Sequence, residues 1–154
     1  MIDFILKFIE LVINILNALL IPLIAIIAAY IAYQQYSINR KKVKLDLYEK
    51  RYNIYKTTKK ILFTVTQDGK IELKELKNSI IGIKNESKFL FNKEVVQFIK
   101  NLQENSIKLN NLNNERIKTT EQQNKANELT NWFTDNYINL EDLYNPYLSF
   151  KNIT

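Results

Sequence analysis

Carboxylates, amines and hydroxyls are the main reactive side chains of this 154-residue chain, because it contains no histidine and no cysteine. A thiolate nucleophile, an imidazole base, a disulfide and a Cys/His zinc site are therefore excluded. Carboxylates occur in close pairs, as in Glu141 with Asp142, but their spacing is typical of solvated helix surfaces and not of a metal-binding loop. We expect no enzyme activity, no metal site and no cofactor, with Glu94 the best single candidate for an acid.

Basic side chains offer a different chemistry, which is the electrostatic binding of an anionic surface. The formal net charge is +6, yet residues 1–39 sum to −1 and residues 61–154 contain twelve charges of each sign. The whole excess lies in residues 40–60, the basic juxtamembrane segment, where each basic side chain near an anionic inner leaflet gains about 1 kcal/mol. Because the remainder is neutral, we expect no nucleic-acid binding. The residues expected to bind lipid headgroups are Arg40, Lys41, Lys42, Lys44, Lys50 and Arg51.

An uncharged segment immediately precedes the basic one and predicts a single membrane-spanning helix. Residues 11–39 carry no charged side chain, and a hydrocarbon core of ~30 Å needs ~20 apolar helical residues. A cleaved signal peptide would carry its positive charge on the other side, and a buried soluble helix would need a larger domain around it. Because Lys and Arg concentrate after the span, we predict a bacterial inner (plasma) membrane protein with its N-terminus outside and its C-terminal part in the cytoplasm.

Small and polar side chains of the span recur four and three residues apart, which places them on one stripe of the helix. Small residues let two helices approach closely, and an intramembrane Asn costs free energy unless it finds a partner. We interpret the stripe as a candidate interface for a second copy of the chain. The alternative is an ordinary span in which Ala is merely frequent. The stripe comprises Asn14, Ala18, Ile21, Ala25, Ala28, Ala32 and Gln35.

Beyond the span, apolar residues keep a helical period and predict that the first helix continues to about Thr66. The sequence Gln-Asp-Gly-Lys at residues 67–70 predicts the turn that ends it. A short helix over residues 71–83 is expected next, closed by a loop at residues 85–92. The Phe-Leu-Phe sequence at residues 89–91 is expected to fill the end of the core.

Two further helices carry start and stop signals. Asn92 predicts an N-cap, and Thr119 with Gln122 has the spacing of a capping box. Pro146 is expected to end the last helix. We therefore predict an all-α fold, in which a transmembrane helix within residues 1–39 continues into a cytoplasmic antiparallel bundle of about four helices at residues 40–154. The many Tyr and Phe side chains are interpreted as core packing and not as a ligand pocket.

Several blocks of sequence stand out together. They are Ile-Ala-Tyr-Gln-Gln-Tyr at residues 31–36, Asn-Arg at 39–40, Lys-Leu-Asp-Leu-Tyr at 44–48 and Arg-Tyr at 51–52, followed by Phe-Leu-Phe at 89–91, Trp-Phe at 132–133 and Pro-Tyr-Leu at 146–148. These blocks resemble a widespread family of small bacterial single-pass inner-membrane proteins with a cytoplasmic helical tail. The resemblance implies the topology and the helical tail, and it implies no particular activity.

Two classes of function fit these expectations. The first is a membrane-anchored helical interaction or scaffold protein, which holds an unknown protein partner or its own oligomer at the inner membrane face. The second is an oligomeric membrane-active effector, pore-forming or depolarising, of the toxin or phage-defence type. Its polar path would be formed by Asn14, Asn17, Gln35 and Asn39. We favour the first class, because the middle of the stripe is Ala and Ile and is too apolar for a standing aqueous pore.

Overall fold

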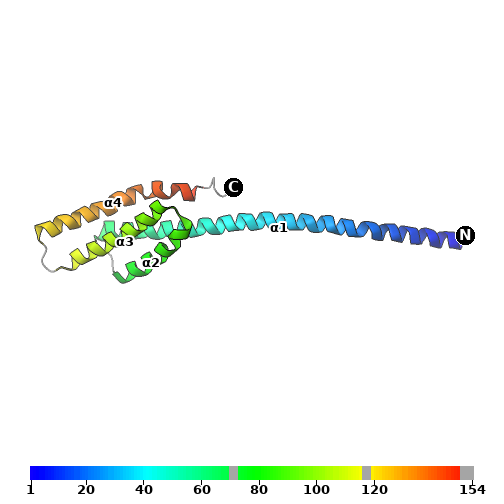
Figure 1. Cartoon of the computed structure of the whole chain (residues 1–154), viewed down its shortest axis with the longest axis horizontal. Coiled ribbons are helices and arrows are strands. Elements are labelled where there is room, and N and C mark those ends of the chain that lie inside the picture. The colour runs from blue at the N-terminus through cyan, green and yellow to red at the C-terminus, as the bar shows by residue number, and fades with distance from the viewer. Residues whose placement is uncertain (70–72, 116–118, 150–154) are drawn as a thin grey trace. The chain divides into compact units, whose positions relative to one another are not determined.

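The computed structural model describes residues 1–69, 73–115 and 119–149, and these residues form four α-helices without a strand (Figure 1). The helices are α1 (Ile2–Asp68), α2 (Leu73–Leu90), α3 (Lys93–Asn114) and α4 (Thr120–Leu148). The chain divides into two compact units, Met1–Val43 and Lys44–Thr154. The predicted all-α class with four helices is confirmed.

The first unit is the N-terminal part of α1. Apart from the half-buried Ser37, every side chain from residue 1 to residue 43 is exposed. Among the helices that the structure describes, α1 is long and apolar enough to cross a membrane, by length and composition. Large apolar side chains are exposed along this unit, and water is a poor solvent for such a surface.

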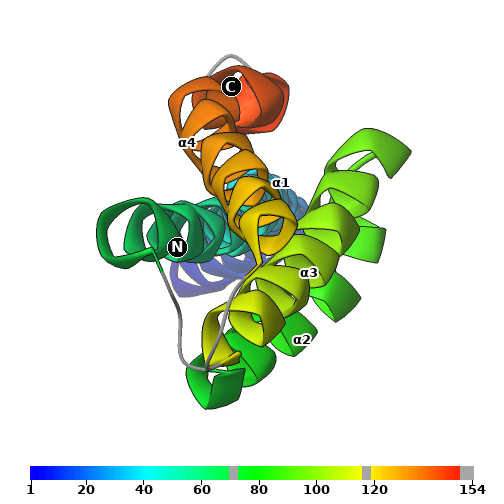
Figure 2. The same cartoon turned by 90° about the vertical axis from the view of Figure 1, so that its left-hand side faces the viewer.

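The second unit has one hydrophobic core to which all four helices contribute. α2 lies along α3, and α3 lies along α4 (Figure 2). In α3 and α4 the buried side chains recur at helical spacing, as in an amphipathic helix. The largest fully buried side chains of the unit are Tyr144, Phe133, Ile54, Leu62, Ile80, Ile99, Leu102, Leu109, Leu140, Val65 and Val95.

The predicted helix boundaries at α1, α3 and α4 have clear local causes. α1 ends where Gly69 adopts a positive φ of 64°, a conformation that glycine adopts without strain. The Asn92 side chain accepts a hydrogen bond from the Val95 N–H at 3.1 Å, so Asn92 is the N-cap of α3. Thr119 and Gln122 form the predicted capping box of α4. Lys70 of the predicted turn lies outside the described residues.

The predicted loop at residues 85–92 was wrong, because α2 continues to Leu90 and only residues 91–92 separate it from α3. Ser87 is fully buried inside this helix, and its hydroxyl donates to the Lys84 carbonyl at 3.0 Å. That bond satisfies the serine without breaking the helix. No Gly or Pro occurs between residues 83 and 90, so the sequence contains no helix-breaking residue that would end α2 there.

The Phe-Leu-Phe sequence only partly fills the end of the core. Phe89 is 90% exposed, whereas Leu90 and Phe91 pack against the core. Successive helical residues point about 100° apart, so the extension of α2 turns Phe89 away from its neighbours. The prediction that Pro146 ends the last helix was wrong, because Pro146 lies inside α4, which continues to Leu148. The Ser149 N–H donates to the Asn145 carbonyl at 3.1 Å and completes the last turn.

Candidate functional site

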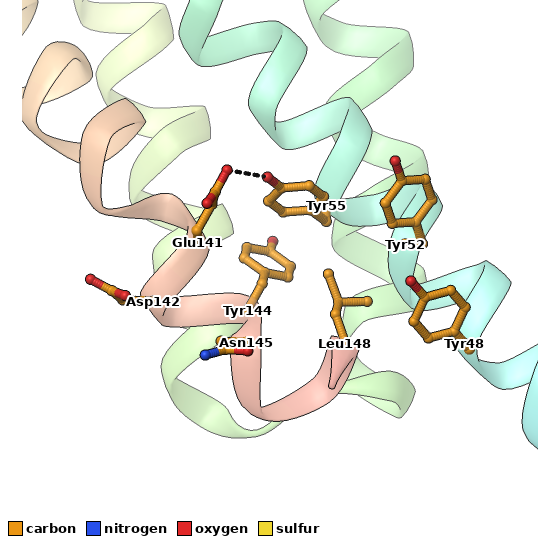
Figure 3. A pocket seen from close by; sticks show the side chains of 8 residues that line it. All are labelled: Tyr48, Tyr52, Tyr55, Glu141, Asp142, Tyr144, Asn145 and Leu148. Atoms are coloured by element: carbon orange, nitrogen blue, oxygen red, sulfur yellow. Dashed lines mark hydrogen bonds between the residues drawn. The ribbon is translucent and has the colours of Figure 1, made fainter. Parts of the chain in front are cut away.

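A cavity of about 330 Å³ opens between α1 and the end of α4 in the second unit, and we call it the tyrosine cleft (Figure 3). α1 supplies one wall and α4 the other, as Figure 3 shows. The two walls are more than 80 residues apart in the chain, so helix packing alone brings them together. The cleft is lined by Tyr48, Tyr52, Tyr55, Glu141, Asp142, Tyr144, Asn145 and Leu148.

The wall from α1 consists of three tyrosines on successive turns. Tyr48, Tyr52 and Tyr55 are four and three residues apart, a spacing that places side chains on one face of a helix. The Tyr48 and Tyr52 rings lie 6.1 Å apart and are almost parallel, with 8° between their planes. The Tyr52 ring is 6.0 Å from that of Tyr55. Tyr52 stays 44% exposed, so the interpretation of these tyrosines as core packing was incomplete.

Tyr144 forms the floor of the cleft and fixes α4 against α1. Its ring meets Tyr55 edge-on at 5.4 Å, a favoured geometry for two aromatic rings. Its hydroxyl lies 3.3 Å from the Thr58 hydroxyl, which itself donates to the Ile54 carbonyl at 2.8 Å. Since the single Thr58 proton is used for that carbonyl, the Tyr144 hydroxyl donates to Thr58. Burial raises the pKa of Tyr144 to about 12.

The Lys59 ammonium group binds Glu141 on the α4 wall. The Lys59 Nζ lies 2.9 Å from a Glu141 carboxylate oxygen and donates to the Tyr55 hydroxyl at 3.1 Å. The Tyr55 hydroxyl also donates to the same Glu141 oxygen at 3.2 Å. The hydrogen bond from Lys59 lowers the pKa of Glu141, and the bond to Glu141 raises the pKa of Lys59. Glu141 is thus paired within the chain.

Asp142, the next residue, differs from Glu141 in its side-chain contacts. Its side chain has no hydrogen bond or ion pair with any residue that the structure describes; it is exposed and points away from the tyrosine rings (Figure 3). The last turn of α4 carries no basic side chain to offset the negative end of the helix dipole.

The six residues predicted to bind headgroups differ from one another in exposure and in their contacts. Arg51 is half-buried, its Nε donates to the Leu90 carbonyl at 3.1 Å, and its guanidinium lies 5.4 Å from the centre of the Tyr147 ring. Arg51 thus holds the second unit together. Lys44 is also half-buried, whereas Arg40, Lys41, Lys42 and Lys50 are exposed and available to a surface.

The seven residues of the predicted transmembrane interface all lie on the exposed part of α1 in the first unit. Their side chains are accessible to another helix in the single chain. The residues are Asn14, Ala18, Ile21, Ala25, Ala28, Ala32 and Gln35.

A second cavity, of about 480 Å³, lies between α3 and α4. The rings of Phe98 and Trp132 stack there at 6.0 Å. Four of its other lining residues carry side-chain amides: Gln97, Asn101, Asn136 and Asn139. This cavity was not predicted from the sequence, because its lining comes from two helices and no motif links them.

Within the described residues, no three acidic side chains come close enough together to hold a metal ion. Comparisons of the chain with known protein families, with curated proteins and with solved structures find no match. The chemistry that its clefts offer is non-covalent binding by aromatic faces, amides and carboxylates.

Proposed function

We propose that this chain is a single-pass membrane-anchored helical interaction protein, which acts by holding a partner or its own oligomer at the cytoplasmic face of a membrane. The observation that carries the proposal is the exposure of the uncharged residues 11–39 next to a unit with its own closed core. A lipid bilayer would take up the apolar surface of the first unit, because its large apolar side chains are exposed.

The proposed topology places the N-terminus outside and the second unit in the cytoplasm of a bacterium. It is supported by the excess of Lys and Arg in residues 40–60 and by the exposure of Arg40, Lys41 and Lys42. The resemblance to small bacterial inner-membrane proteins agrees with it. The antiparallel bundle is proposed as the part that presents a binding surface.

Single cysteines test this topology directly, because the natural chain has none and every signal comes from the introduced thiol. We expect Ile2→Cys to react with a membrane-impermeant maleimide in intact cells, and Ser149→Cys to react only after permeabilisation. The unmodified chain is the control for background labelling. Release of the chain by alkaline carbonate, or the reverse labelling pattern, would contradict the proposal.

Self-association through the stripe is tested in the same cysteine-free background. If the stripe is an interface, cysteines at Ala25 and Ala28 will form disulfide-linked dimers faster than cysteines at Leu23 and Ile27, because only the stripe residues face the second copy. The four variants have similar depth in the span and serve as matched controls. Equal yields at all four positions would remove the stripe from the proposal.

A membrane-active effector is the second candidate function. It is favoured by the exposed amides on α1, at Asn14, Asn17, Gln35 and Asn39, because unpaired amides in hydrocarbon are costly and a water-filled path would solvate them. Conductance of liposomes containing the purified chain would support this candidate. Tight liposomes, together with a stable partner that copurifies in mild detergent, would support the interaction protein instead.

A further inference from the structure

The second unit has two ends, and a hydrogen bond places the junction of α2 and α3 at the end where α1 enters. At the far end, α1 stops just before Gly69, and the Asn113 side chain of α3 donates to the Gly69 carbonyl at 2.9 Å. At the entry end, Arg51 is the eighth residue of the unit, and its Nε donates to the Leu90 carbonyl at 3.1 Å. Residues 88–93, which we call the α2–α3 corner, therefore lie at the entry end.

The corner carries an exposed aromatic side chain. Phe89 is 90% exposed, the highest value among the large apolar side chains that the structure describes in this unit. The next two residues pack against the core, and the Phe91 ring meets the Tyr147 ring edge-on at 5.0 Å. These contacts fix the backbone of the corner, so Phe89 is held outside the core. Water is a poor solvent for such a ring.

Basic side chains flank Phe89 in the sequence. Lys88 ends the preceding helix, Lys93 begins the next one, and both are exposed. Two carboxylates are also near: Glu94 lines the cavity between α3 and α4, and Glu86 is exposed about one turn before Phe89. An apolar ring between two ammonium groups is typical of a side-chain set that binds the interface of an anionic bilayer.

The corner is tethered close to the predicted span. Arg51 lies twelve residues beyond Asn39, the last residue of the uncharged segment, and that length of α1 is about 18 Å. The uncharged residues 11–39 would form about 44 Å of helix, whereas a hydrocarbon core is ~30 Å thick. A helix longer than the core tilts, and tilting lowers one side of the attached unit toward the bilayer. A membrane surface is therefore within reach of the corner.

We propose that the α2–α3 corner is a second membrane contact, in which Phe89 enters the headgroup region of an anionic leaflet and Lys88 and Lys93 lie against lipid phosphates. The exposed basic residues 40–42 concentrate anionic lipids at the same place. A single apolar side chain binds a bilayer weakly, but the span already confines the corner to the surface, so a weak contact is sufficient. The contact orients the second unit against the membrane. This proposal rests on the membrane anchorage proposed above.

The test uses the full-length chain in nanodiscs of phosphatidylglycerol that contain a lipid with a nitroxide on its headgroup, which quenches nearby tryptophan. All variants carry Trp132→Phe, which removes the single natural tryptophan and keeps a ring. We expect the emission of Phe89→Trp to be quenched roughly twofold or more strongly than that of Ile107→Trp, a partly exposed position on α3 about 21 Å along the helix from Lys93. Circular dichroism checks that each variant keeps its helices.

Tyr36→Trp distinguishes failure of the corner from failure of the anchor, because Tyr36 is 60% exposed and lies near the cytoplasmic end of the uncharged segment. Strong quenching at Tyr36 with equally weak quenching at Phe89 and Ile107 would overturn the corner contact alone. Weak quenching at Tyr36 would contradict the anchorage, and the corner contact would fall with it. A blue-shifted emission of Phe89→Trp without quenching would assign the corner to a protein contact and would also overturn the proposal.

Paired lysine substitutions test the role of charge in the Phe89→Trp chain. Lys88→Gln together with Lys93→Gln should reduce the quenching by roughly a third or more, because the ammonium groups no longer bind the anionic headgroups. Lys100→Gln together with Lys108→Gln removes the same charge from exposed positions further along α3 and should leave the quenching unchanged. Equal losses from the two pairs would overturn the assignment of the corner lysines, since only the total charge of the unit would then matter.

Discussion

The hydrogen bond between Thr58 and Tyr144 gives the sharpest test of how α4 is held against α1. Both side chains are fully buried, at 0% exposure, and their hydroxyl oxygens are 3.3 Å apart. The Tyr144 hydroxyl is the donor, so the two residues are not equivalent. Removing the donor leaves Thr58 bonded to the Ile54 carbonyl, whereas removing the acceptor leaves a buried O–H without a partner.

The expected free energies follow from this asymmetry. Tyr144→Phe loses one neutral hydrogen bond, which costs about 0.5–1.5 kcal/mol of unfolding free energy. Thr58→Val keeps the side-chain shape but strands the Tyr144 hydroxyl, which costs about 1–3 kcal/mol. The double variant has no polar atom left to strand, so its cost should be close to that of Tyr144→Phe alone. The sum of the two single-variant costs should therefore exceed the cost of the double variant, and the difference is the free energy of leaving the Tyr144 hydroxyl without a partner.

The assay is urea unfolding of the full-length chain in micelles, followed by Trp132 fluorescence and by circular dichroism. Coincident transitions from the two probes are the condition for comparing free energies. Two results would refute the reasoning: a larger loss for Tyr144→Phe than for Thr58→Val, or single costs that add within about 0.3 kcal/mol in the double variant.

Three other predictions concern the same unit. The pKa of Tyr144 is raised from its ordinary value of 10 to about 12, so its contribution to stability is complete below pH 10 and is lost as the pH rises to 12; the natural chain should lose about 2–3 kcal/mol more than Tyr144→Phe over that range in parallel unfolding curves. Gly69→Ala should cost about 1 kcal/mol, because φ is 64° while a new Cβ meets nothing within 4 Å, and a cost near zero in the same assay would show that the backbone relaxes. Phe89→Ala should change stability by less than about 0.5 kcal/mol, since Phe89 is 90% exposed, whereas Phe91→Ala should cost about 2–3 kcal/mol; similar melting temperatures for the two variants would contradict the packing.

Features that depend on neighbours in the chain could be predicted from the sequence. Asn92, Thr119 and Gly69 end or begin helices through bonds or dihedral angles within four residues, and all three were predicted correctly. Residues 85–90 were not, because Asn, Glu, Ser and Lys are compatible with both a helix and a loop, and burial of Ser87 decided between them.

The tyrosine cleft could be predicted only in part. The spacing of Tyr48, Tyr52 and Tyr55 shows that they share a face of α1, but nothing near them in the sequence indicates that Glu141 and Tyr144 lie opposite. That pairing depends on how α4 packs, through contacts between residues 86 apart, such as Tyr55 with Glu141. Arg51 was assigned to lipid headgroups for the same reason, because its partner, the Leu90 carbonyl, is 39 residues away.

The distance in sequence between α1 and α4 also has a consequence during synthesis of the protein. Ile54, Leu62 and Val65 are made well before Phe133, Leu140 and Tyr144, which share their core. At ~5–20 residues per second, a ribosome needs roughly 4–16 s to synthesise the intervening ~80 residues. During that interval the apolar face of α1 is open to chaperones, proteases and other nascent chains. The pace of translation between the two helices therefore sets how long this face of α1 waits for α4.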